Sequence, residues 1–222
     1  MKVIITGATG MVGKGVLLEC LDNDAVTAVL VVNRRTVDVQ HPKLTEIIHK
    51  DFFDLSPISE QLAGYDACFF CLGISSFRQS EEVYTKITYD LTMNFAGALL
   101  KSNPGMVFIY VSGTGTDSTE SGSTMWARVK GKTENDIIKL GFRDAYAFRP
   151  AYIKPESNTP SSTPIYQVLL TIFGVLHPVI KFLFPKYTTT TAQIAKAMIE
   201  VVQHGFERKQ VESIDIVQLS ER

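Results

Sequence analysis

Short apolar runs alternate with segments of helical spacing along the first two thirds of the chain. The apolar runs are typical of parallel strands buried on both faces, and they cover residues 2–6, 26–32, 65–71, 106–111 and 145–148. Residues 44–49 predict a further strand, of alternating apolar and polar character. Helical spacing follows the first run and recurs in residues 80–100 and 124–140, and a short helix is expected over residues 57–62. This alternation predicts an α/β fold, a doubly wound parallel sheet that binds ligands at the carboxyl ends of its strands.

The regular alternation stops near residue 150. We therefore expect a single domain with a core of residues 1–150 and a small C-terminal lobe of residues 151–222. Residues 154–164 are rich in Pro, Ser and Thr, which predicts a loop. Residues 190–204 predict an amphipathic helix ended by Gly205, and residues 213–219 alternate like a closing strand.

Residues 165–184 form an apolar stretch about long enough to cross a bilayer. Gln167, His177 and Lys181 interrupt it with polar groups, and Pro178 breaks its helical continuity. We therefore expect no membrane span. The alternatives left open are a cover over the cofactor cleft, the face of a homodimer and a face that lies on a membrane surface.

The composition gives no argument for nucleic acid or an anionic membrane as a partner, because 22 basic and 23 acidic residues leave a formal net charge of −1. None of the four histidines has a partner at a spacing that suggests a metal site. Three cysteines without a signal peptide indicate a reducing compartment, and we expect a cytoplasmic protein. Cys68 and Cys71 lie in an apolar run, which favours buried strand cysteines over a redox pair.

The first fifteen residues contain the strongest local pattern of the chain. Gly7, Gly10 and Gly13 directly follow the first strand and lead into a helix. The first glycine can turn sharply, the second lets the backbone approach a pyrophosphate, and the third allows close packing of helix and strand. The N–H groups of the first helical turn would then face the anion. A P-loop is excluded because Gly15, rather than Ser or Thr, follows Lys14.

Polar residues follow the next strands at the same predicted edge. Arg34 and Arg35 come after the second strand, where an acidic residue would bind the ribose of NAD and guanidinium groups suit the 2′-phosphate of NADP. We therefore expect NADP rather than NAD. Asp51 follows the third strand and either accepts a hydrogen bond from the adenine amino group or caps a helix. Gly73, after the fourth strand, can pass close to the nicotinamide ribose.

Three motifs resemble the short-chain dehydrogenase/reductase superfamily, in particular its extended and atypical members, the epimerase/dehydratase-like group. Residues 6–13 match the signature TGATGxxG, residues 71–73 resemble the stretch after the fourth strand, and residues 148–150 match the FRP ending of the sixth. The likeness covers residues 1–155 well and the 190–204 helix more loosely. It implies a Rossmann fold with the cofactor on Gly7, Thr9, Gly10, Met11, Val12, Gly13, Asn33, Arg34, Arg35, Asp51, Phe52, Cys71, Leu72, Gly73 and Lys130.

The catalytic residues of this superfamily are Tyr-x-x-x-Lys on a helix and a Ser or Thr after the fifth strand. The resemblance implies that the tyrosine is the general acid/base, that the lysine lowers its pKa and holds the nicotinamide ribose, and that the hydroxyl orients the carbonyl. The matching helix here reads WARVK, with Lys130 in place and Trp126 instead of the tyrosine. An indole N–H cannot exchange a proton near neutral pH. Ser112 or Thr114 is the candidate hydroxyl, and Gly113 stands between them.

Two hypotheses on function follow from these departures. The first is an NADP-dependent oxidoreductase or nucleotide-sugar epimerase, with an unusual proton donor and a carbonyl or sugar substrate that the sequence does not identify. The second is a non-catalytic sensor or interaction protein that binds NADP(H). The retained Lys130 supports the first hypothesis, whereas Trp126 and Gly113 support the second.

Overall fold

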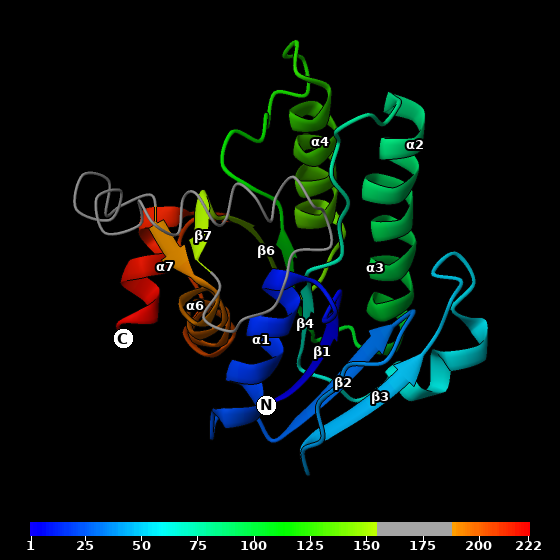
Figure 1. The fold of residues 1–222 in the computed structure, drawn as a ribbon, viewed down its shortest axis with the longest axis vertical. Helices are drawn as coiled ribbons and strands as arrows, with labels where there is room; N and C mark the ends of the chain where they lie inside the picture. Colours follow the sequence, from blue (N-terminus) through cyan, green and yellow to red (C-terminus); the bar gives the residue numbers. More distant parts are fainter. Residues whose placement is uncertain (155–187) are drawn as a thin grey trace.

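A computed structural model describes residues 1–154 and 188–222. Its centre is a seven-stranded parallel sheet with the strand order β3-β2-β1-β4-β5-β6-β9 (Figure 1). The strands are β1 (Lys2–Thr6), β2 (Ala28–Asn33), β3 (Leu44–Ile48), β4 (Ala67–Phe70), β5 (Val107–Val111), β6 (Asp144–Arg149) and β9 (Gln210–Glu212). The strand order reverses between β1 and β4, so the loops that follow these two strands lie at the point where dinucleotides bind in such sheets.

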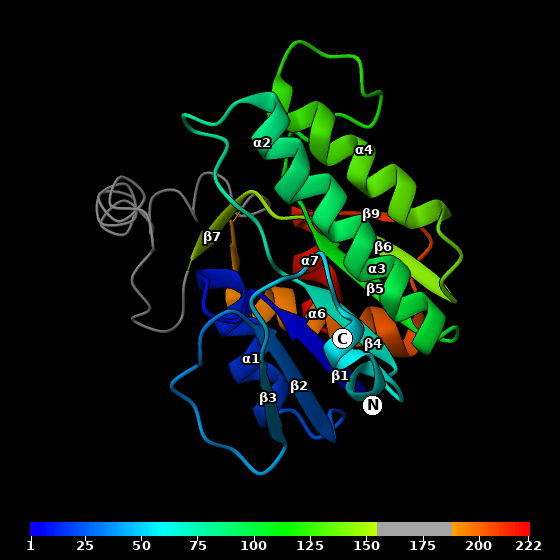
Figure 2. The same cartoon turned by 90° about the vertical axis from the view of Figure 1, so that its right-hand side faces the viewer.

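Helices cover both faces of the sheet (Figures 1 and 2). One face carries α1 (Met11–Asp22), α6 (Thr191–His204) and α7 (Ser213–Ser220). The other carries the short 3₁₀ helix η1 (Ser56–Leu62), α4 (Met125–Lys139) and a long helix made of α2 (Glu81–Thr85), the π-helical turn η2 (Lys86–Asp90) and α3 (Leu91–Ser102). Neighbouring residues of each strand enter opposite cores, as Ile5 and Ile4 of β1 do.

The strands and helices predicted for the first 150 residues are confirmed, with ends shifted by one or two residues in most cases. Cys68 and Cys71 are free thiols that pack into the cores on opposite faces of the sheet, as expected of strand residues three apart. The predicted helix over 190–204 is confirmed too: Thr190 and Gln193 form a capping box at its start, and Gly205 ends it with a φ of 74°.

The prediction of a closing strand over residues 213–219 is wrong, because this segment is α7. The closing strand is β9, which lies immediately before it and pairs with β6. Glu212 and Asp215 form a capping box that starts the helix, and Ile216 and Leu219 bury the same helical face. Apolar residues at positions 214 and 216 imitate strand alternation, but the capping residues determine the outcome.

The C-terminal part of the chain also completes the core. A Cβ atom on Gly15 of α1 would lie 2.2 Å from Cβ of Thr191. The start of α6 therefore packs directly against the backbone of α1. A second, two-stranded sheet joins β7 (Tyr152–Lys154) to β8 (Thr188–Thr190). The predicted loop over 154–164 and the apolar stretch 165–184 lie outside the described residues, except for Lys154. Among the described residues, no helix has the length and apolar character needed to cross a membrane.

Candidate functional site

The three glycines form a tight turn between β1 and α1. Gly7 has a φ of 70°, and a Cβ atom there would lie 2.7 Å from the carbonyl carbon of Cys71. A Cβ atom on Gly13 would lie 2.3 Å from the carbonyl oxygen of Gly7. Gly10 has an ordinary φ of −86°, and the nearest described atom to a Cβ there would be the Gly7 oxygen, at 3.3 Å. The turn therefore needs glycine at positions 7 and 13 for its own geometry, whereas position 10 leaves room in front of the helix.

Several hydrogen-bond donors at this turn have no acceptor among the described residues. Among the described residues no side chain caps α1, and its first turn contains no acidic residue, so its N–H groups are left open to an anion. Asn33, at the end of β2, is 4% exposed, and its Oδ1 accepts a hydrogen bond of 3.2 Å from the Ala8 N–H. The Nδ2 of Asn33 is buried and has no hydrogen-bond partner in the described chain. A buried donor of this kind fits an oxygen atom of a bound dinucleotide.

A pocket of about 160 Å³ brings together most of the predicted cofactor residues. It is lined by Gly7, Thr9, Gly10, Asn33, Arg34, Arg35, Phe52, Cys71, Leu72 and Gly73. Met11 and Val12 lie beside it at the start of α1. Asp51 lies outside it, because its Oδ1 accepts a hydrogen bond of 2.9 Å from the Phe53 N–H in a local turn.

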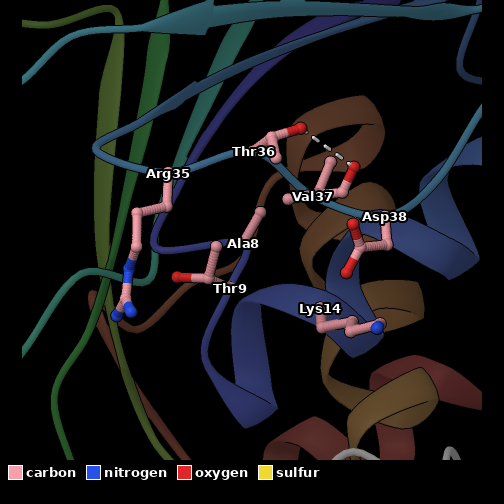
Figure 3. Close-up of a pocket in the computed structure, with 7 residues that line it drawn as sticks. All are labelled: Ala8, Thr9, Lys14, Arg35, Thr36, Val37 and Asp38. Carbon is pink, nitrogen blue, oxygen red and sulfur yellow. Dashed lines mark hydrogen bonds between the residues drawn. The ribbon is translucent and has the colours of Figure 1, made fainter.

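A second pocket of about 260 Å³ lies between α1 and the loop after β2 (Figure 3). Arg35 extends along one side of it, and Lys14 and Asp38 lie on the other side. Glu46 of β3 holds the loop, because its carboxylate accepts hydrogen bonds of 2.7 Å from the Thr36 hydroxyl and from the Val37 N–H. Neither Lys14 nor Glu46 was predicted from the sequence to belong to this region.

Lys130 lies at the other end of the carboxyl edge, on α4. Its Nζ donates a hydrogen bond of 2.8 Å to the carbonyl oxygen of Ser112, at the end of β5, and lies 5.8 Å from the centre of the Tyr110 ring. Burial lowers the pKa of Lys130 to about 8, an effect that the nearby carboxylate of Glu134 partly offsets. The lysine is thus retained where the resemblance places it, in surroundings that weaken its hold on the proton.

The hydroxyl groups after β5 do not point into the site. The Ser112 hydroxyl donates a hydrogen bond to the carboxylate of Glu134. The Oγ1 of Thr114 donates to the carbonyl oxygen of Arg149 at 3.0 Å, and the Oγ1 of Thr116 donates to that of Gly113 at 2.7 Å. Because a hydroxyl has one proton, none of these three groups has one left to orient a substrate carbonyl.

The carboxylate that accepts the Ser112 hydrogen bond belongs to a buried ion pair. Glu134 is fully buried on α4, and its carboxylate oxygens accept hydrogen bonds of 3.0 and 3.1 Å from the Nε of Arg149. The same guanidinium reaches Glu212 of β9 at 3.2 Å and contacts Ser118. This network was not predicted from the sequence. Its one indication there is the position of Glu134, one helical turn after Lys130.

Trp126 occupies the position of the absent tyrosine. It is half-buried, and its ring would lie 3.4 Å from a Cβ atom on Gly115, so it packs against the loop that follows β5. The indole therefore fills space beside Lys130 without supplying an acid. It is also the only tryptophan of the chain.

The sheet order, the glycine turn and the open helix start define a Rossmann domain that binds dinucleotides. A profile of the family described as NAD(P)H-binding matches residues 7–147, and the chain belongs to this family. The resemblance to extended and atypical short-chain dehydrogenases/reductases is thereby confirmed.

Two curated relatives and one solved structure illustrate the similarity. The mitochondrial protein FMP52 of Candida albicans is 30% identical over 160 residues, which are 70% of this chain and 69% of that protein. Protein HTATIP2 of Rattus norvegicus is 27% identical over 154 residues, 68% of this chain and 62% of that protein. The Bordetella bronchiseptica enzyme WbmF in complex with NAD+ has the same fold, with a TM-score of 0.69, 13% identity and coverage of 99% of this chain and 76% of WbmF.

The expectation of a cytoplasmic protein is contradicted by these relatives. FMP52 of Candida albicans and its counterparts in other fungi are named mitochondrial proteins. Reduced cysteines and the lack of a recognised signal peptide do not distinguish the cytoplasm from other reducing compartments, which is why that inference failed.

Proposed function

We propose that this protein binds NADP(H) in preference to NAD(H) and has weak or no carbonyl reductase activity. The main support is the pair Arg34 and Arg35 directly after β2, where both line the cofactor pocket. Arg35 also extends into the neighbouring pocket, where Lys14 adds a second positive charge (Figure 3). Guanidinium groups bind phosphate oxygens with charge-assisted hydrogen bonds, which the 2′-hydroxyl of NAD cannot match.

The rest of the cofactor would follow the carboxyl edge of the sheet. The first turn of α1 and the Nδ2 of Asn33 would hold the pyrophosphate and the adenosine ribose, and Lys130 would hold the nicotinamide ribose. NADPH, when bound, supplies a hydride. Two features support low activity: position 126 has no tyrosine, and the hydroxyls of Ser112 and Thr114 donate to protein acceptors instead of facing the site. General acid/base catalysis contributes about 10²–10⁴-fold.

Replacement of Arg35 tests the cofactor preference. We expect Arg35→Ala to weaken NADPH binding by about 10- to 100-fold, since a charge-assisted hydrogen bond contributes roughly 1.5–3 kcal/mol. The affinity for NADH should hardly change. Quenching of Trp126 emission by the reduced nicotinamide measures both constants, because no other tryptophan contributes.

Arg143→Ala is the matched control, because Arg143 precedes β6 and so lies at the opposite, amino edge of the sheet. It should bind NADPH like the wild type. Tighter binding of NADH than of NADPH by the wild type would contradict the proposed preference.

A second candidate function, slow reduction of a carbonyl compound, is favoured by one observation. Lys130 is kept beside the end of β5 although its usual tyrosine partner is missing. A sensor that only binds the cofactor would show Trp126 quenching by NADPH without any oxidation of NADPH. A slow reductase would show both.

A further inference from the structure

We propose that Lys130 is itself the proton donor when a carbonyl compound is reduced in this site. The inference rests on the NADP(H) binding proposed above and assigns to the lysine the task that a tyrosine has in the superfamily. Three observations carry it: the position and donor capacity of the amine, the engagement of the hydroxyl groups after β5 with protein acceptors, and the environment of the amine.

The position of the amine comes from the helix that carries it. Lys130 follows Trp126 by one turn of α4, so both side chains project from the same side of the helix. Its Nζ is fixed by the carbonyl oxygen of Ser112 at 2.8 Å, at the carboxyl end of β5. An ammonium group has three donor hydrogens, and that bond uses one. The structure gives the other two no hydrogen-bond partner among the described residues.

Neighbouring groups are poor proton donors. The protons of Ser112, Thr114 and Thr116 are held by protein acceptors. Tyr110 and Tyr84 are 2% and 1% exposed, and burial raises the pKa of Tyr110 further above its usual value. Both phenols therefore lie beneath the site and not in it.

The charges around Lys130 set its acidity. On α4 the Glu134 carboxylate favours the ammonium form, but Arg149 of β6 is bound to that carboxylate and neutralises much of its charge. Tyr110 of β5 is neutral, because burial raises the pKa of its phenol. Tyr84 of α2 is buried as well. Burial therefore dominates and lowers the pKa of Lys130 to about 8. Near neutral pH the amine is protonated and yet can release its proton, as a general acid must.

The step balances without any further reactant. NADPH, when bound, would supply the hydride that reduces the carbonyl carbon, and an alkoxide and NADP+ would result. The alkoxide oxygen takes a proton from the Nζ of Lys130, directly or through one water molecule, and an alcohol results. Lys130 is left as a neutral amine, and solvent water returns its proton before the next turnover.

The first measurement needs no cofactor. Lysine amines of the free protein are acylated with acetic anhydride at pH 6–11, and the modified sites are quantified by mass spectrometry. We expect Lys130 to become reactive with a midpoint near pH 8, whereas an unperturbed lysine amine has a pKa of about 10.4. Lys139, exposed in the last turn of α4, serves as the internal reference. A midpoint for Lys130 as high as that of Lys139 would overturn the proposal.

The second measurement follows NADPH oxidation with 4-nitrobenzaldehyde as the carbonyl probe, at saturating NADPH. We expect slow turnover by the wild type that falls by about tenfold per pH unit above the pKa of Lys130. Lys130→Arg keeps the positive charge but cannot give up a proton near neutral pH. NADPH should therefore still quench Trp126 in this variant, whereas its turnover rate should fall by about 100-fold or more. Lys139→Arg is the matched control and should match the wild type.

The outcomes separate this inference from the proposed function. If NADPH fails to quench Trp126, NADP(H) binding itself is refuted. If NADPH binds but the aldehyde is not reduced at any pH, or if Lys130→Arg keeps the wild-type rate and pH profile, only the role of Lys130 is refuted. The partly buried phenol of Tyr152 on β7 is the rival donor. Loss of turnover in Tyr152→Phe alone, with Lys130→Arg active, would identify it instead.

Discussion

A Gly10→Val variant should fold like the wild type and bind NADPH at least about 100-fold more weakly. The backbone at Gly10 already has a φ that valine adopts, and a Cβ atom there would meet only the Gly7 oxygen, at 3.3 Å. The rest of the side chain would occupy the space in front of α1, where the pyrophosphate would approach the helix N–H groups. Loss of two charge-assisted hydrogen bonds of roughly 1.5–3 kcal/mol each gives this magnitude.

Titration of Trp126 fluorescence with NADPH measures the effect, and circular dichroism reports the fold. Gly105→Val is the matched control, because a Cβ atom at Gly105 would meet nothing within 4 Å and the residue lies in the loop before β5. It should bind NADPH normally. A folded Gly10→Val protein with wild-type affinity would remove the glycine turn from the cofactor site. Gly13→Ala is less informative, since its clash with Gly7 would disturb the turn itself.

The second large effect concerns stability. Arg149→Met should lower the free energy of unfolding by about 3–5 kcal/mol, because it leaves the Glu134 carboxylate buried without its cation. Glu134 is 0% exposed and cannot rotate into water. Urea unfolding at pH 7, followed by circular dichroism, measures the change.

Arg128→Met provides the comparison. Arg128 forms an ion pair with Glu81 in which the two side chains are 25% and 56% exposed. Pairs of this kind contribute about 1 kcal/mol or less, so this variant should unfold close to the wild type. Adding Glu134→Gln to Arg149→Met should recover part of the lost stability, because both charges of this ion pair are then removed. Equal unfolding midpoints for Arg149→Met and Arg128→Met would show that the buried pair contributes no more than the exposed one.

The sequence predicted the sheet and the glycine turn well because both depend on local patterns. A five-residue apolar run followed by glycines at positions 7, 10 and 13 specifies strand, turn and helix within fifteen residues. The same holds for α6, where Thr190 marks the start and Gly205 the end. Segment 213–219 failed because strand alternation and helical spacing overlap in so short a run.

The catalytic end was less predictable because its contacts join distant parts of the chain. The Ser112 hydroxyl donates a hydrogen bond to Glu134, 22 residues away. Arg149, 15 residues further on, binds that carboxylate. No spacing rule indicates such contacts. The sequence therefore left Ser112 open as a carbonyl-orienting hydroxyl, and only the packing of α4 against β5 and β6 shows that its proton is already used.

The contact between Gly15 and Thr191 has a consequence for how this protein can be divided or recombined. The helix that would hold the pyrophosphate is backed by a helix from the opposite end of the chain, at a distance that leaves no room for a Cβ atom. Seven of the 27 buried residues described for one core, Ile194 and Met198 among them, come from that helix. The glycine-rich half is therefore not an independent module: exchanging segments between relatives at residue 150 would separate two surfaces that fit each other closely.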